Sequence, residues 1–82
     1  MGYIIKVAMK PNIELANGFE SITFSTSPCT FKIEDVNTLT EYFNPVSGLF
    51  ESDKSWLTFE SGSTLLIKQS YDITEAELIA LN

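Results

Sequence analysis

Residues 54–69, KSWLTFESGSTLLIKQ, decide the fold, because the turn inside them fixes which side chains share a face of the sheet. A two-residue loop at Ser61 and Gly62 would leave both faces of the hairpin mixed. A three-residue loop that begins at Glu60 instead places Gly62 in the left-handed conformation of a G1 bulge. One face of the hairpin then becomes entirely apolar, and a slip of one residue would destroy this separation. We therefore predict the bulged turn.

In this register Trp56 pairs with Leu66 on the second, mixed face of the hairpin. Two interpretations of that face stay open. Another part of the chain covers the pair, since tryptophan is usually well buried, or the pair forms an aromatic anchor for a partner. Tyr42 and Tyr71 are lesser candidates, with a half-buried core position and a hydrated hydroxyl as the alternative. The candidate interaction residues are Trp56, Leu66, Tyr42 and Tyr71.

The N-terminal part of the chain predicts further strands. Residues 3–10 alternate in polarity, and Pro11 is expected to end this strand because proline has no N–H for the ladder. The face expected to be buried consists of Tyr3, Ile5, Val7 and Met9.

A tight hairpin is the clearest local signal in this part of the chain. Asn17 and Gly18 tolerate positive φ at both central positions, so they predict a type I′ turn in which Ala16 faces Phe19. Residues 25–28, STSP, break the pattern. The strand that follows is expected to point three side chains inward, namely Cys29, Phe31 and Ile33.

Two helices are predicted. The first covers residues 35–44, begins at an N-cap formed by Asp35 or by Thr38, and ends before Pro45. Its apolar face consists of Val36, Leu39 and Phe43.

The second helix lies at the C-terminus. Thr74 is the predicted N-cap, because Glu77 completes a capping box and Ile73 can pack on Leu78 as a hydrophobic staple. Between the two helices, residues 46–51 read as a short strand and residues 52–55 as a turn.

These elements predict a single globular domain over residues 1–82. The fold class is α+β, with a small, mainly antiparallel sheet of five to seven short strands and two short helices. A small, partly open barrel that the C-terminal helix plugs is the alternative.

The composition excludes several classes of function. There is no His, so the usual general base and the usual metal ligand are both missing, and one Cys cannot form an internal disulfide. Residues 1–33 carry three Lys and two acidic residues, and residues 34–82 carry two Lys and nine acidic residues, so the net charges are +1 and −7. With no Arg and this balance, direct binding of nucleic acid or of an anionic membrane is not expected. A cytoplasmic location is expected from the cysteine content.

No catalytic constellation, cofactor motif or metal site is expected, and we predict that the chain is not an enzyme. The sequence favours a small acidic, non-enzymatic protein-binding module, such as an adaptor, inhibitor or small assembly subunit. A homo-oligomer is in keeping with its size. The alternative is a nucleic-acid-related regulator, or an acidic mimic of nucleic acid that binds a basic protein.

Overall fold

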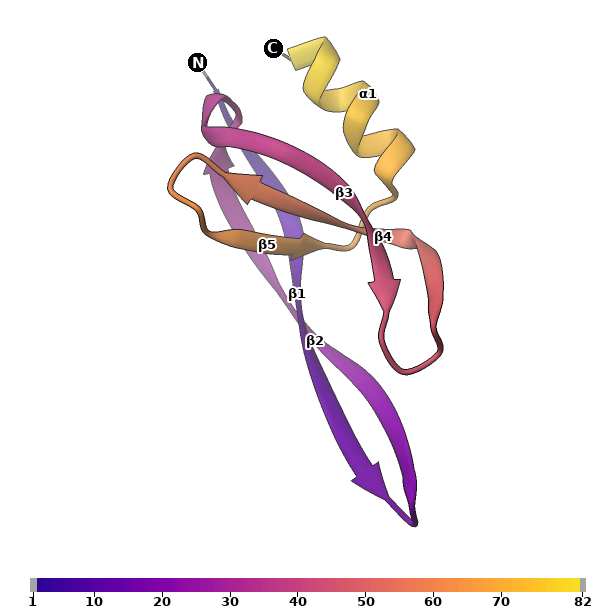
Figure 1. Cartoon of the computed structure of the whole chain (residues 1–82). Helices are drawn as coiled ribbons and strands as arrows, with labels where there is room; N and C mark the ends of the chain where they lie inside the picture. Colours follow the sequence, from indigo (N-terminus) through magenta and orange to yellow (C-terminus); the bar gives the residue numbers. More distant parts are fainter. Residues whose placement is uncertain (1, 82) are drawn as a thin grey trace.

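The computed structural model describes residues 2–81 and shows one open antiparallel sheet of five strands with a single C-terminal α-helix (Figure 1). The strand order is β2-β1-β5-β4-β3, so β2 and β3 are the two edges. This confirms the α+β class with a mainly antiparallel sheet, whereas the prediction of two helices was wrong. The elements are β1 (Tyr3–Ala16), β2 (Phe19–Lys32), the 3₁₀ turn η1 (Ile33–Asp35), β3 (Val36–Asn44), β4 (Leu49–Phe59), β5 (Thr64–Ile67) and α1 (Tyr71–Leu81).

The first hairpin is longer than predicted. The turn is as expected, with Asn17 at φ 54° and Gly18 at φ 79°, and Ala16 pairs with Phe19. Neither Pro11 nor the STSP segment that contains Pro28 ends a strand. Ile33 N donates a backbone hydrogen bond to Gly2 O, and this bond shows which residues of β1 and β2 point their N–H groups at each other. Pro11 and Pro28 both occupy positions whose nitrogen points away from the partner strand. No ladder bond is lost there, so the strands continue.

The predicted helix over residues 35–44 is wrong, because η1 and β3 occupy this segment. The register of β3 against β4 shifts between Val36 and Thr38 and again between Glu41 and Tyr42. The first shift leaves one extra residue on β3, so Val36 and Leu39 face the same way although they are three apart. Leu39 and Phe43 are four apart and share a face by ordinary alternation. The Val, Thr, Tyr and Phe content of the segment suits a strand. One bulge thus imitated the spacing of a helix.

The predicted register of the second hairpin is confirmed. Trp56 pairs with Leu66, and Phe59 N donates to Ser63 O at 2.9 Å. Gly62 adopts φ 91°, as the bulged turn requires. Residues 52–55 are not a turn but part of β4, where the pairing jumps from Ser55 to Glu51 and leaves three residues without a partner on β3.

Helix α1 begins one turn earlier than predicted. Ser70, not Thr74, is its N-cap, because Ile73 N donates to Ser70 Oγ at 3.2 Å. Thr74 instead lies buried inside the first turn and donates to Ser70 O at 2.8 Å. Ile73 is exposed and Glu77 is paired with Lys6, so neither the staple nor the capping box forms.

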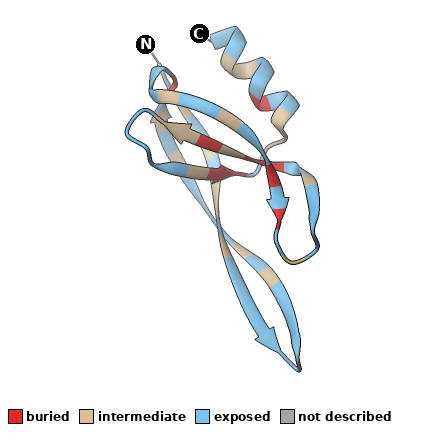
Figure 2. Ribbon diagram, in the orientation of Figure 1, coloured by how far each residue is buried: buried red, intermediate tan, exposed pale blue. Residues whose placement is uncertain are grey.

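The sheet has a helix face and a Trp56 face. On the helix face, Leu57 and Ile67 are fully buried, and Ser55 Oγ donates to Gln69 O just before α1. On the Trp56 face, Leu66 and Tyr42 are buried. Figure 2 shows that the buried residues gather on β3, β4, β5 and the first turn of α1, so the core is small and central.

The face predicted to be buried on β1 is the exposed one. Ala8 pairs with Ile67, which turns the even-numbered residues of β1 toward the helix face. Ile4 and Lys6 are therefore half-buried, while Tyr3, Ile5 and Val7 are exposed. On β2 the expected inward side chains are covered to different degrees: Ile33 is buried, and Cys29 and Phe31 are half-buried. Phe31 meets Phe59 edge to face at 5.3 Å between ring centroids.

Candidate functional site

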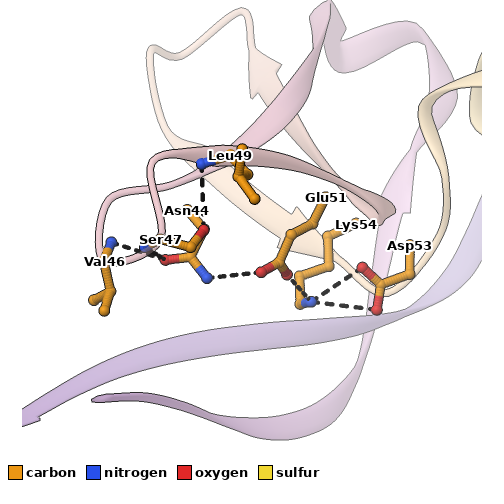
Figure 3. Close-up of polar contacts among 7 residues, drawn as sticks. All are labelled: Asn44, Val46, Ser47, Leu49, Glu51, Asp53 and Lys54. Atoms are coloured by element: carbon orange, nitrogen blue, oxygen red, sulfur yellow. Dashed lines mark hydrogen bonds and ion pairs between the residues drawn. The ribbon is translucent and has the colours of Figure 1, made fainter. Parts of the chain in front are cut away.

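A buried lysine and two carboxylates form a connected polar cluster (Figure 3). The Lys54 side chain is only 8% exposed, and its Nζ lies 2.6 Å from Glu51 and 3.1 Å from Asp53. Asn44 Nδ2 donates to Glu51 at 2.7 Å, and its Oδ1 accepts from Val46 N at 2.8 Å. Residues 52–54 of β4 have no partners on β3, and this irregular segment places Asp53 and Lys54 beside Glu51.

Two aromatic rings lie beneath the ammonium group. Lys54 Nζ is 4.7 Å from the centroid of Phe24 and 5.6 Å from that of Tyr42. Phe24 belongs to β2 and Tyr42 to β3, the two edges of the sheet, and their rings meet edge to face at 5.9 Å. A cation–π contact of this kind stabilises a desolvated cation. The cluster thus joins the two edge strands across the Trp56 face.

The pKa shifts agree with a structural role for this cluster. Burial alone would lower the pKa of Lys54, but hydrogen bonds with Glu51 and Asp53 outweigh it and raise the pKa. The hydrogen bond from Asn44, followed by that from Lys54, lowers the pKa of Glu51. Burial, followed by the charge of Glu51, raises the pKa of Tyr42. At neutral pH all three groups therefore keep their ordinary charge states, and none is poised to exchange a proton.

The four predicted interaction residues do not form one surface. Leu66 and Tyr42 are buried within the chain. For Tyr42 this differs from the predicted alternative of a half-buried ring with a hydrated hydroxyl, because the hydroxyl is itself buried. Trp56 is half-buried, and its ring centroid lies 6.3 Å from that of Tyr42. Tyr71 is separate from these three residues, since it opens α1 on the helix face and is half-buried.

Tyr71 belongs to a groove between α1 and β3. A cavity of about 280 Å³ lies between the two elements, and a second of about 160 Å³ continues past Tyr71 toward Glu41 and Phe50. The charge of Glu75 and a side-chain hydrogen bond with it raise the pKa of Tyr71, with smaller contributions from Glu41 and Asp72. This end of the groove is therefore strongly acidic.

A group of exposed apolar side chains lies at the end of the first hairpin, and the sequence analysis missed it. We call residues 10–25 the arm, because β1 last pairs with β5 at Met9 and the hairpin continues beyond that point without another strand beside it (Figure 1). At the base of the arm, Phe24 still packs against Tyr42 and Lys54. Leu15 is 73% and Phe19 77% exposed, and Ile13 is exposed as well. Uninterrupted alternation across Pro11, with no third segment able to pair with it, was the signal in the sequence.

The described residues also bear on metal binding and on membrane insertion. No group of three or more His, Cys, Asp or Glu residues within 2–81 is arranged to hold a metal ion. In the same part of the chain, no helix is long and apolar enough to cross a membrane. The notable surface features include the arm, the groove and a further hollow of about 530 Å³ beside Phe31, Phe59 and Leu65.

Comparison with known proteins adds no identity, since no protein-family model, curated protein or solved structure matches this chain.

Proposed function

We propose that this chain is a small, non-enzymatic protein-binding module that self-associates through the arm. One observation carries the proposal: the arm is a two-stranded ribbon with large apolar side chains exposed on both of its faces. Leu15 points to one face, and Phe19, which pairs with Ala16, points to the other. Figure 2 shows almost the whole arm as exposed.

Such a ribbon is not expected to be stable by itself. A two-stranded hairpin is at best marginally stable in water, and three strands or a packed face are needed for independent stability. Among the described residues, twelve large hydrophobic side chains are exposed and only five hydrophobic side chains are buried, so much of the apolar surface lacks cover. Exposed apolar patches of this kind mark interaction surfaces on small proteins.

Charge favours a second copy of the chain at the arm rather than elsewhere. The arm carries Lys10 against Glu14 and Glu20, a net charge of −1, whereas residues 33–81 carry two Lys and nine acidic residues, a net charge of −7. Two copies that approach through residues 33–81 would repel each other. Contact between two arms avoids that repulsion and covers the apolar side chains.

The experiment compares the wild type with the double variant Leu15→Ser/Phe19→Ser. Sedimentation equilibrium should show concentration-dependent association for the wild type and a monomer for the variant. Hydrogen exchange should show arm amides that gain protection as the wild-type concentration rises. The matched control is Leu49→Ser/Phe50→Ser, which removes two equally exposed apolar side chains outside the arm and should still associate. A wild type that stays monomeric with unprotected arm amides at every concentration would refute the proposal.

A further inference from the structure

We infer that the groove between β3 and α1 binds an extended peptide segment of a partner protein, which adds to the sheet as a sixth strand. The peptide would carry apolar residues toward one end and a Lys or Arg toward the other. This inference does not depend on the arm, because the groove lies on the opposite edge of the sheet.

The backbone of β3 is available for pairing. β3 is an edge strand, and within residues 2–81 it pairs only with β4. The larger cavity is lined by four consecutive residues of β3, 36–39. Beyond the bulge that separates Val36 from Thr38, consecutive residues point to opposite faces, so a cavity that touches both Thr38 and Leu39 reaches the strand edge. An extended peptide at such an edge gains main-chain hydrogen bonds, which is the mode called strand addition.

The wall opposite the strand is one side of α1. Tyr71, Glu75, Leu78 and Ile79 line the cavity, and their spacing places them on a single helical face. Ile79 is exposed and Leu78 is half-buried. Together with Ile33 and Leu39 across the groove, they give this end several apolar side chains within an otherwise polar lining. A ligand side chain that enters here would be Val, Ile or Leu.

The other end of the groove, formed by the smaller cavity, suits a positively charged side chain of the peptide. The smaller cavity begins at Tyr71 and is lined by Glu41, Glu51, Asp72 and the aromatic ring of Phe50. Lys54 also lines it, but its charge is already paired with Glu51 and Asp53. No cation pairs with Glu41, Asp72 or Glu75 among the described ion pairs. Carboxylates beside exposed aromatic rings fit an Arg or Lys side chain.

The length of the groove sets the length of the peptide. The β3 residues that line the two cavities run from position 36 to position 41. At about 3.3 Å per residue, six extended residues span about 20 Å. A hexapeptide is therefore the natural probe.

The test pans a phage library of random hexapeptides on the immobilised chain and synthesises the most enriched sequence. We expect an apolar residue and a Lys or Arg at opposite ends. A twin peptide with N-methylated backbone amides keeps the side chains but loses the N–H donors, and it should bind at least about tenfold more weakly. Amide chemical shifts should change along β3 and α1. The inference fails if the library yields no binder, if enriched peptides lack a basic residue, or if the shifts fall on the arm.

Matched variants separate this site from the arm. Glu41→Lys, at the end of the groove that takes the cation, should weaken binding of the selected peptide about five- to tenfold, because an attraction in an exposed site becomes a repulsion. Glu14→Lys makes the same charge change on the arm and should leave binding unchanged. The double variant Leu15→Ser/Phe19→Ser should bind the peptide like the wild type even if it no longer self-associates. Equal affinity for wild type and Glu41→Lys would overturn the inference.

Discussion

Replacing Tyr42 with Phe should stabilise this protein. The Tyr42 side chain is 2% exposed, and its hydroxyl has no hydrogen-bond partner among the described residues. A buried hydroxyl without a partner costs about 1–3 kcal/mol of desolvation. The ring contacts with Phe24, Trp56 and Lys54 do not involve the hydroxyl and should persist in the variant. We expect the free energy of unfolding to rise by about 1 kcal/mol, the lower end of this range.

Urea unfolding at one fixed protein concentration measures the change, with the fluorescence of the single Trp56 as the signal. For a domain of this size, 1 kcal/mol corresponds to an increase of about 4–8 °C in Tm. Tyr3→Phe is the control, because Tyr3 is 67% exposed and removing its hydroxyl should change nothing measurable. A Tyr42→Phe variant that is less stable than the wild type would show that the hydroxyl is satisfied in the folded state and would refute the reasoning.

The pH dependence of stability provides a second test of the Tyr42 hydroxyl. Burial, followed by the charge of Glu51, raises the folded-state pKa of Tyr42 above its ordinary value of 10.0. The associated stability is fully present below the unfolded pKa and is lost as pH rises through the folded pKa. Tyr42→Phe has no such loss. The stability advantage of the variant should therefore widen above pH 10.

Three further predictions concern the core, the turn and the ion pair that ties α1 to β1. Leu57→Ala should cost about 2–5 kcal/mol in urea unfolding, whereas Leu49→Ala, at an exposed position, should change the free energy by less than about 0.5 kcal/mol. Gly62→Ala should cost about 1–2 kcal/mol through its φ of 91° alone, since an added Cβ meets nothing within 4 Å; an unchanged midpoint would argue against the bulged turn. The hydrogen bond from Lys6, followed by that from Gln69, lowers the pKa of Glu77, so its stabilisation is present above the ordinary value of 4.5 and is lost as pH falls through the folded pKa. Glu77→Gln should thus be less stable than the wild type at neutral pH, by under about 1 kcal/mol because the side chain is 36% exposed, and the two proteins should converge in acid.

The parts of the fold that sequence predicted correctly are those that local backbone chemistry determines. Asn17 and Gly18 fix one hairpin because both adopt positive φ, and Gly62 fixes the other together with its register. Each of these signals lies within a few residues of the structure it specifies. The C-terminal helix was predicted for the same reason, although two hydroxyl residues four positions apart, Ser70 and Thr74, could each have served as its cap.

The errors share a different physical origin, which is pairing with distant segments. Residues 36–44 become a strand only because β4 lies beside them, and the bulge that brings Val36 and Leu39 onto one face exists only in that pairing. Pro11 is harmless because the register with β2 turns its nitrogen outward. The cover over Trp56 comes partly from Tyr42, whose own cover is Phe24 on the far edge of the sheet. No local pattern encodes such contacts.

The exposed arm reflects an imbalance in this chain between a small buried core and a large exposed apolar surface. An 82-residue domain has a thin margin of stability even when its apolar side chains are well buried. Here the buried side chains gather around Leu57, Leu66 and Ile67, while the arm extends away from them. If a second copy covers the arm, it binds only the folded state and stabilises it by mass action. The stability of the wild type would then rise with its concentration, and the arm, an unfavourable feature of a monomer, would be the element that links folding to assembly.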